Sequence, residues 1–353
     1  MKTIKVGSDF SGVGAFNQAL RRLGVEYHEI FACDMDKFAR ETFIHNYGEP
    51  DYYPTNVYQR EIPSESLDIY VSSPPCQAFS LAGKRLGKDD KRGILFFNSY
   101  EFIQVNKPRF FIFENVKGLL SDDNGNTFNE WLNLLGGKSV NGVPVLFPHE
   151  ESVPYHLYWK VLNAKNHGVP QNRERVFLIG IRDDQDNHFR FPVEEHLTKR
   201  LKDVLEEDIQ DKYFLSEKMI SGFMVHNENH NAKGTGFIFQ PKNQNEIANC
   251  LRANASLCAT DNTLLILKCK YTFHSCMNYG NMCKDCDEGD NYKFLQNENE
   301  KSIYRRLTPR ECFRLMDFPE SFTWTVSDSQ AYKQAGNSIV VNVLYKLLKN
   351  LPL

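Results

Sequence analysis

The sequence predicts an α/β fold with an open, mostly parallel sheet, joined to a smaller irregular region that is rich in β-structure. Through residue 182, short apolar runs of strand length alternate with segments of helical periodicity, which is typical of parallel sheets covered by helices. Between residues 183 and 299 this alternation stops, and Asn, Gly, Lys and Glu surround scattered apolar runs. We therefore expect two parts with different architectures in one chain.

The first predicted strand, residues 4–8, leads into a loop with Phe10, Gly12 and Gly14 and then into a helix. Glycines at this point let the backbone approach a nucleotide-like ligand, and the helix N-terminus offers free amides. The apolar residues at helical spacing are Phe16, Ala19, Leu20 and Leu23.

The second predicted strand, residues 29–33, ends at Asp34. Asp34 follows Gly14 by about twenty residues, where an acid reaches ribose hydroxyls in this class of fold. Asp34 could instead cap the helix that begins near Lys37, and both roles are compatible.

Cys76 follows the apolar run 67–71 and the proline pair Pro74 and Pro75. The prolines fix the backbone and favour a rigid turn at a strand end. A thiol there is a candidate nucleophile, and a buried inert thiol is the alternative.

Glu114 follows the apolar run 110–113. Ligands collect at the carboxyl ends of parallel strands, so Cys76 and Glu114 can face one substrate. A thiolate can add to C6 of a cytosine, and a carboxylic acid bonded to N3 and the exocyclic amine can stabilise the resulting electron-rich ring, whose C5 then takes a methyl group. A helix cap is the alternative for Glu114.

Two further strands are predicted at residues 156–162 and 175–181. Arg173 and Arg175 stand two apart on an extended segment, so their side chains should point to the same face. A guanidinium suits bidentate binding of a carboxylate or a base edge.

The composition is that of a globular protein, with 353 residues, 41% hydrophobic and 25% charged. The chain lacks the roughly 18 consecutive apolar residues of a membrane span and the apolar core of a signal peptide, so we expect a cytoplasmic protein. Its nine cysteines make a disulfide scaffold an unattractive interpretation. Although the net charge is −3, residues 84–92 carry five Lys or Arg and two Asp, and this local positive charge favours a contact with nucleic acid over an ordinary solvated loop.

Taken in order, six blocks of the chain resemble those of DNA cytosine C5-methyltransferases of the bacterial and phage restriction-modification type, which use S-adenosylmethionine. The blocks are residues 10–14, 75–77, 114–116, 170–176, 306–319 and 334–339. The resemblance implies a discontinuous Rossmann-like methyltransferase domain, residues 1–182 and 303–353, with a mixed, mostly parallel sheet and helices on both faces. Residues 183–302 would form a target-recognition domain that reads base edges.

The resemblance also assigns residues to the cofactor, S-adenosylmethionine. Asn56 falls where the family commonly has Asp facing the adenine amine, and its side-chain oxygen can still accept that hydrogen bond. The residues assigned to the cofactor are Phe10, Gly12, Gly14, Asp34, Met35, Asn56, Asn337 and Ser338.

For the reaction, the resemblance implies a covalent adduct between Cys76 and C6 of a cytosine flipped out of double-stranded DNA. Glu114 would bind the base, with one of Arg173 and Arg175 contacting the base and orienting the acid. The protein is expected to act as a monomer, and a cognate restriction endonuclease is a candidate partner.

One branch of the family methylates transfer RNA, and a catalytically silent DNA-binding regulator is the other alternative. The separate recognition region favours duplex DNA, and the presence of both thiol and acid favours activity.

The sequence departs from the family pattern at two places. Cys250 replaces the threonine of a usual Thr-Leu pair, which puts contact with the flipped-out strand in doubt there. A cysteine cluster could hold a structural zinc, although reduced surface thiols explain the same residues. Its members are Cys276, Cys283 and Cys286 with either Cys269 or His274.

Overall fold

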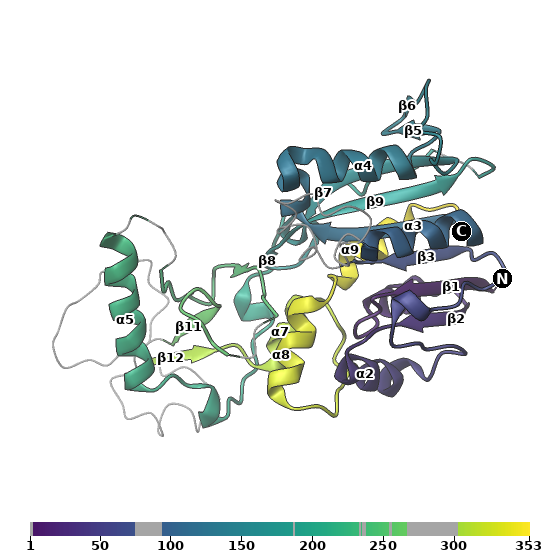
Figure 1. Cartoon of the computed structure of the whole chain (residues 1–353). Coiled ribbons are helices and arrows are strands. Elements are labelled where there is room, and N and C mark those ends of the chain that lie inside the picture. Colours follow the sequence, from purple (N-terminus) through teal and green to yellow (C-terminus); the bar gives the residue numbers. More distant parts are fainter. Residues whose placement is uncertain are drawn as a thin grey trace.

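The structure is a computed structural model that describes residues 3–74, 94–185, 188–232, 234, 238–253, 256–266 and 303–353. A sheet flanked by helices forms one part of the molecule, and the described residues of the recognition region extend from it to one side (Figure 1). In the described part of the chain, no helix combines the length and the apolar character needed to cross a membrane.

The main sheet has eight strands in the order β2-β1-β3-β4-β9-β7-β5-β6. The pairs β2–β1, β1–β3 and β3–β4 are parallel, whereas β9 is antiparallel to both β4 and β7. The predicted mixed, mostly parallel sheet is therefore confirmed. Its strands are β1 (Ile4–Asp9), β2 (Tyr27–Cys33), β3 (Ile69–Ser72), β4 (Phe110–Val116), β5 (Ser139–Val140), β6 (Val143–Pro144), β7 (Tyr155–Asn163) and β9 (Glu174–Arg182).

Helices cover both faces of this sheet, because its central strands are apolar on both sides. Phe110 and Ile112 of β4 pack in one hydrophobic cluster, and Phe111 and Phe113 pack in the other, as the alternation of a strand requires. The first cluster also takes residues from α1 (Ala15–Leu23), α2 (Lys37–Tyr47), α7 (Pro309–Leu315), α8 (Asp328–Asn337) and α9 (Val341–Lys349). The second takes residues from α3 (Ile94–Asn106) and α4 (Asn126–Leu135).

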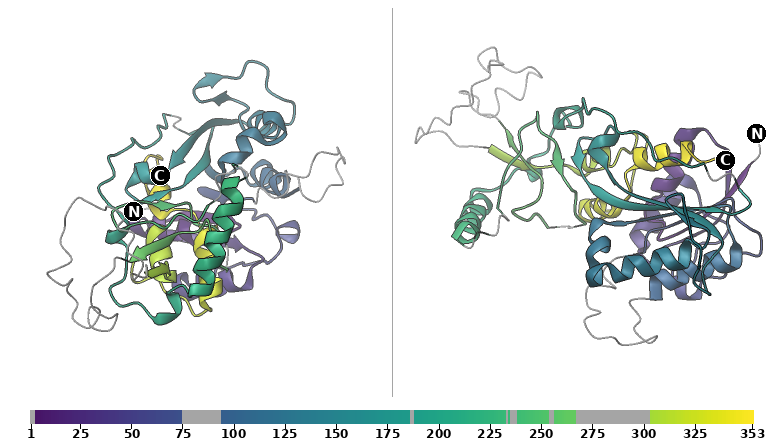
Figure 2. Two further views of the ribbon diagram at one scale, coloured as in Figure 1. Left: turned by 90° about the vertical axis from the view of Figure 1, so that its left-hand side faces the viewer. Right: turned by 90° about the horizontal axis from the view of Figure 1, so that it is seen from above.

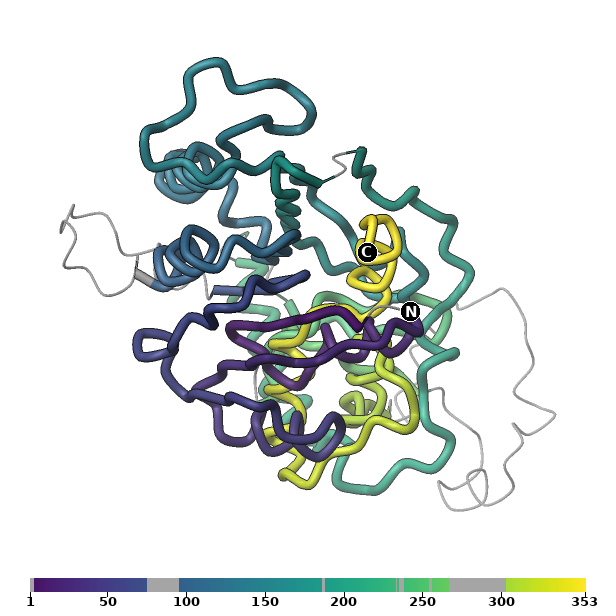
Figure 3. Tube along the Cα trace, turned by 90° about the vertical axis from the view of Figure 1, so that its right-hand side faces the viewer, coloured from purple at the N-terminus to yellow at the C-terminus, as the bar shows by residue number. Residues whose placement is uncertain are grey.

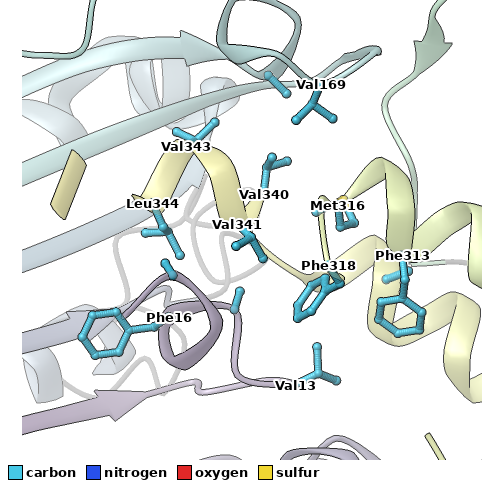
Figure 4. Packing of buried hydrophobic residues seen from close by; sticks show 14 of the residues in the cluster. Val13, Phe16, Val169, Phe313, Met316, Phe318, Val340, Val341, Val343 and Leu344 are labelled. Atoms are coloured by element: carbon cyan, nitrogen blue, oxygen red, sulfur yellow. The ribbon is translucent and has the colours of Figure 1, made fainter. Parts of the chain in front are cut away.

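The C-terminal segment packs against the start of the chain and completes the first cluster. Val341 and Leu344 lie on the side of α9 that faces α1, which carries Phe16, and Phe318 faces Val13 (Figure 4). The view in Figure 3 shows this return of the C-terminal residues to the N-terminal strands. The two discontinuous parts of the predicted methyltransferase domain therefore share one core.

Two short sheets, separate from the main sheet, join residues of the predicted recognition region to the rest of the chain. β10 (Ala248–Asn249) pairs with β8 (Gln171–Asn172), and β11 (Thr263–Ile266) pairs with β12 (Ile303–Arg306). The long helix α5 (Glu217–Ala232) lies at the far end of this region (Figure 2). The short 3-10 helices of the described chain are η1 (Val57–Gln59), η3 (Lys117–Gly125), η4 (Ala164–His167), η5 (Leu201–Asp203) and η6 (Asp211–Tyr213).

Candidate active site

The register of the parallel strands brings the predicted site residues to one edge of the sheet. Asp9, the last residue of β1, lies opposite Cys33 of β2 and Ser72 of β3. Ser72 in turn lies opposite Phe113 of β4, the residue before Glu114. The loop after β1, Asp34, the turn after β3 and Glu114 therefore meet at the carboxyl edge, as the sequence predicts.

At one end of this edge, Asp34 is held by backbone amides. Its Oδ2 accepts a hydrogen bond from the Gly12 N–H at 2.8 Å, and its Oδ1 accepts one from the Asp36 N–H at 2.8 Å. Burial raises the pKa of Asp34, and these two hydrogen bonds oppose that rise. The alternative that Asp34 caps helix α2 is wrong, because Asp36 is the N-cap and accepts from Phe38 N–H at 3.0 Å.

The two glycines of the loop after β1 have different surroundings. Both have positive φ, 55° at Gly12 and 83° at Gly14. A Cβ added to Gly14 would lie 2.3 Å from the ring of Tyr47, whereas one added to Gly12 would meet nothing within 4 Å. Gly14 is thus required by packing and backbone conformation, while Gly12 borders open space next to the Asp34 carboxylate. That space is where a ligand with hydroxyl groups can reach the carboxylate.

The remaining residues assigned to the cofactor vary in exposure. Met35 is 86% exposed, so its side chain is free to cover a ligand beside Asp34. Asn56 caps η1, with its Oδ1 accepting from Tyr58 N–H at 3.0 Å. Asn337 is the exposed last residue of α8, and Ser338 is buried directly after it.

At the other end of the edge, Glu114 pairs with Arg175. The Nε of Arg175 lies 3.0 Å from Oε1 of Glu114, and both residues belong to the antiparallel pair of β4 and β9. Burial raises the pKa of the Glu114 carboxyl, while Arg175 and Arg173 lower it. The helix-cap alternative for Glu114 is wrong, because β4 continues to Val116 and Val116 is the N-cap of η3.

Arg173 has a different set of partners from Arg175. Its Nη1 donates to the Leu251 carbonyl at 2.9 Å, and its Nη2 donates to the carbonyls of Gly336 and Ser338 at 3.0 and 2.9 Å. Both arginines also reach the Cys250 thiol, at 3.4 Å from Arg173 and 3.8 Å from Arg175, so they do share one face. Arg173 thereby joins the predicted recognition region to the C-terminal segment, whereas Arg175 is the arginine that pairs with Glu114.

Cys76 lies outside the described residues, but the chain on its N-terminal side is fixed near Glu114. The side-chain amide of Asn115 donates to the Pro74 carbonyl at 3.0 Å. Cys76 is two residues beyond Pro74, a distance of at most about 7 Å along the chain. The basic segment 84–92 and the candidate zinc ligands Cys269, His274, Cys276, Cys283 and Cys286 also lie outside the described residues.

Three buried polar residues at this edge were not found from the sequence. Asn115 could have been found, because it directly follows Glu114. Asp9, which directly precedes Phe10, forms a buried ion pair with Arg60, whose Nε lies 2.9 Å from Asp9 Oδ1. Neither belongs to a spacing pattern, so no sequence signal marked this pair.

A glycine loop and a buried acid at one end of an open sheet, with an acid–arginine pair at the other, are typical of an enzyme that brings a nucleotide-like cofactor to a polar substrate. The chain belongs to the C-5 cytosine-specific DNA methylase family, whose model matches residues 4–352. It is therefore a DNA (cytosine-5) methyltransferase, and this family generally uses S-adenosylmethionine.

Curated relatives cover nearly the whole chain. The type II methyltransferase M.HpaII of Haemophilus parainfluenzae is 34% identical, over 94% of this chain and 84% of its own. The orphan methyltransferase M.SPRI of Bacillus phage SPR is 31% identical, over 99% of this chain and 98% of its own. Among solved structures, the Dnmt2 methyltransferase of S. pombe has a TM-score of 0.70 at 20% identity, covering 98% of this chain and 97% of its own, which shows the same fold.

Proposed function

We propose that the chain methylates C5 of a cytosine flipped out of a specific double-stranded DNA sequence, through a covalent bond between Cys76 and C6. The observation that carries this proposal is the buried Glu114–Arg175 pair next to the Pro74 carbonyl that Asn115 holds. The pair presents an oriented carboxyl group, and the neighbouring Asn115 holds Pro74, which precedes Cys76 by two residues. This arrangement suits acid-assisted nucleophilic attack on a heteroaromatic ring.

In the proposed reaction three residues of this chain have defined tasks. The Cys76 thiolate adds to C6 while Glu114 supplies a proton to N3, so that C5 becomes nucleophilic. The raised pKa of Glu114 favours the protonated form that this step needs. After C5 is methylated, a base removes the C5 proton, the bond between sulfur and C6 breaks, and N3 returns its proton to Glu114. Arg175 holds the carboxyl group in place throughout.

The residues at the other end of the edge fit S-adenosylmethionine. The open space at Gly12 and the carboxylate of Asp34 suit a ribose with two hydroxyls, and exposed Met35 can cover an adenine. When bound there, the cofactor supplies an electrophilic methyl group. Phe10, Gly14, Asn56, Asn337 and Ser338 complete the proposed pocket.

Residues 183–302 are proposed as the target-recognition domain, and residues 1–182 and 303–353 as the catalytic domain. Arg173 supports this division, since it fixes the Leu251 carbonyl of the recognition region to the Gly336 and Ser338 carbonyls of the catalytic part. Base reading by loops beside a fixed catalytic edge suits duplex DNA. We further propose that the protein acts as a monomer in the cytoplasm, with a cognate endonuclease as its functional partner.

Trapping on 5-fluorocytosine tests the chemistry. Duplex DNA copied from a whole plasmid with 5-fluoro-2′-deoxycytidine offers every short target, and fluorine at C5 cannot be removed as a proton. With S-adenosylmethionine, wild type should form an adduct that survives a denaturing gel, and Cys76→Ser should not. An adduct on fluorinated transfer RNA instead of DNA would favour the RNA alternative, and no adduct on either would overturn the mechanism.

A further inference from the structure

Next to Phe10 in the sequence, Asp9 forms a buried ion pair with Arg60 that neither the proposed reaction nor the sequence pattern accounts for. The Asp9 side chain is 0% exposed and the Arg60 side chain 2%. Asp9 Oδ1 lies 2.9 Å from Arg60 Nε, and Asp9 Oδ2 accepts from the Tyr70 hydroxyl at 2.6 Å. A buried pair of this kind gives little net stability to a fold, since desolvation of the charges offsets their attraction.

The position of Arg60 connects it to several elements around the proposed adenine pocket. Its Nη2 donates to the Asn98 carbonyl of α3 at 3.3 Å, and its guanidinium carbon lies 4.6 Å from the centre of the Phe102 ring. It also follows η1 directly, and the turn from Asn56 to Arg60 is closed by its own backbone hydrogen bonds. Fixing the guanidinium therefore fixes the turn that carries Asn56.

Asp9, the other member of the ion pair, also lies next to a residue of the proposed adenine pocket. It directly precedes Phe10, whose φ of 57° places a non-glycine residue in the left-handed region. That conformation costs roughly 1 to 2 kcal/mol, so the surrounding structure must hold it. The paired and hydrogen-bonded Asp9 carboxylate anchors the backbone immediately before this strained residue.

We propose that Asp9, Arg60 and Tyr70 form a positioning device that sets Phe10 and the Asn56 turn for cofactor binding. The device holds two walls of the adenine pocket in register before the cofactor arrives, which lowers the ordering cost of binding. This inference rests on the proposed cofactor site. It assigns Arg60 no contact with cofactor or substrate.

Titration calorimetry with S-adenosylhomocysteine tests the device without requiring methylation or knowledge of the DNA target. Asp9→Leu with Arg60→Met replaces the pair by apolar side chains, and it is expected to fold because such replacements are commonly tolerated. We expect its Kd for S-adenosylhomocysteine to rise by about tenfold. Tyr70→Phe, which removes one hydroxyl, should raise the Kd by about threefold. In both variants KM for the cofactor should rise while kcat at saturating cofactor stays near wild type.

A matched control uses the other buried arginine–carboxylate pair of the described chain with closely similar burial. Arg305 and Glu311 have side chains 3% and 0% exposed, with Arg305 Nη2 2.7 Å from Glu311 Oε1. Arg305→Met with Glu311→Leu should leave the Kd for S-adenosylhomocysteine within about twofold of wild type, whatever it does to Tm.

The outcomes separate this inference from the proposed function. A wild type that fails to bind S-adenosylhomocysteine counts against the proposed cofactor site. If wild type binds and the Asp9 and Arg60 replacement binds equally well, the positioning role is overturned. An equal rise in Kd on replacement of Arg305 and Glu311 also overturns the positioning role, since the loss of any buried ion pair would then weaken binding. If the double replacement does not fold, an unchanged Kd in Tyr70→Phe overturns the proposal.

Discussion

The two ends of the active edge hold their carboxylates by different means. At the end proposed to bind the cofactor, here called the cofactor end, Asp34 accepts hydrogen bonds from the backbone amides of Gly12 and Asp36. At the end proposed to bind the target cytosine, here called the base end, Glu114 of β4 pairs with the guanidinium of Arg175. Arg175 belongs to β9, which is antiparallel to β4. Burial raises the pKa of both acids.

This difference indicates what each carboxyl group must do. Amide donors favour the ionised form of Asp34, which suits a permanent acceptor for hydroxyl groups. In the proposed reaction Glu114 exchanges a proton, and the orientation of its side chain must survive that change. The Arg175 side chain also donates to the Glu174 carbonyl at 2.8 Å, so it keeps a second partner when Glu114 is neutral. The base end is therefore expected to be sensitive in kcat and the cofactor end in binding.

The largest effect is expected from Cys76→Ser. Methyl transfer to DNA, measured with radiolabelled cofactor, should fall by more than about 10⁴-fold, because the hydroxyl is a far weaker nucleophile than a thiolate. Affinity for S-adenosylhomocysteine should stay at the wild-type value. Substantial residual transfer would exclude an obligatory adduct at this residue.

Next in size is Glu114→Gln, which keeps the shape of the side chain but removes its acid. We expect kcat to fall roughly 10²- to 10⁴-fold with little change in cofactor Kd. Glu174→Gln is the matched control, since Glu174 is a neighbouring exposed carboxylate that pairs with Lys117 at 3.0 Å. Equal losses of kcat in the two variants would mean that the loss reflects local charge and not acid catalysis.

At the cofactor end, Asp34→Ala should weaken S-adenosylmethionine binding by roughly 1 to 3 kcal/mol, because ribose hydroxyls lose a charged acceptor. Calorimetry measures this directly, and DNA affinity should change little. Asp36→Ala is the control, since it removes the cap of α2 but keeps the backbone amide that Asp34 uses. Unchanged cofactor affinity in Asp34→Ala would remove Asp34 from the binding site.

The smallest effect on catalysis is expected from substitution of Glu29, which lies on β2, the strand that ends directly before Asp34. Its side chain accepts from Asn17, and burial raises its pKa from 4.5 to about 8. The folded state keeps a proton that the unfolded state releases, so this contribution to stability is complete below pH 4.5 and is lost as pH rises through about 8.

Denaturant unfolding at several pH values between these limits measures this loss. Wild type should lose at most about 1.4 kcal/mol per pH unit through this group, and Glu29→Gln should remove that part of the slope. Glu26→Gln, an exposed substitution on the same approach to β2, should leave the slope unchanged. A wild-type slope retained in Glu29→Gln would assign the dependence to another group.

Much of the fold was predictable because its signals are local. The predicted strands at residues 156–162 and 175–181 are confirmed as β7 and β9, and the predicted first helix is confirmed as α1. The runs 67–71 and 110–113 are confirmed as β3 and β4, although β4 extends through Glu114 to Val116. The apolar segment after Ser338 becomes helical only at Val341, where α9 begins, because Val340 packs into the core in extended form.

The sequence by itself indicated the strands, the glycine loop and the candidate acid at each end, because periodicity and spacing act within a few tens of residues. Only the tertiary structure showed that Arg175 pairs with Glu114 while Arg173 binds backbone carbonyls. It also paired Asp9 with Arg60, which lies 51 positions away in the sequence. Side chains two apart on a strand share a face, so spacing cannot assign their partners. A buried charge finds its partner through folding of the whole sheet, and no local pattern records that choice.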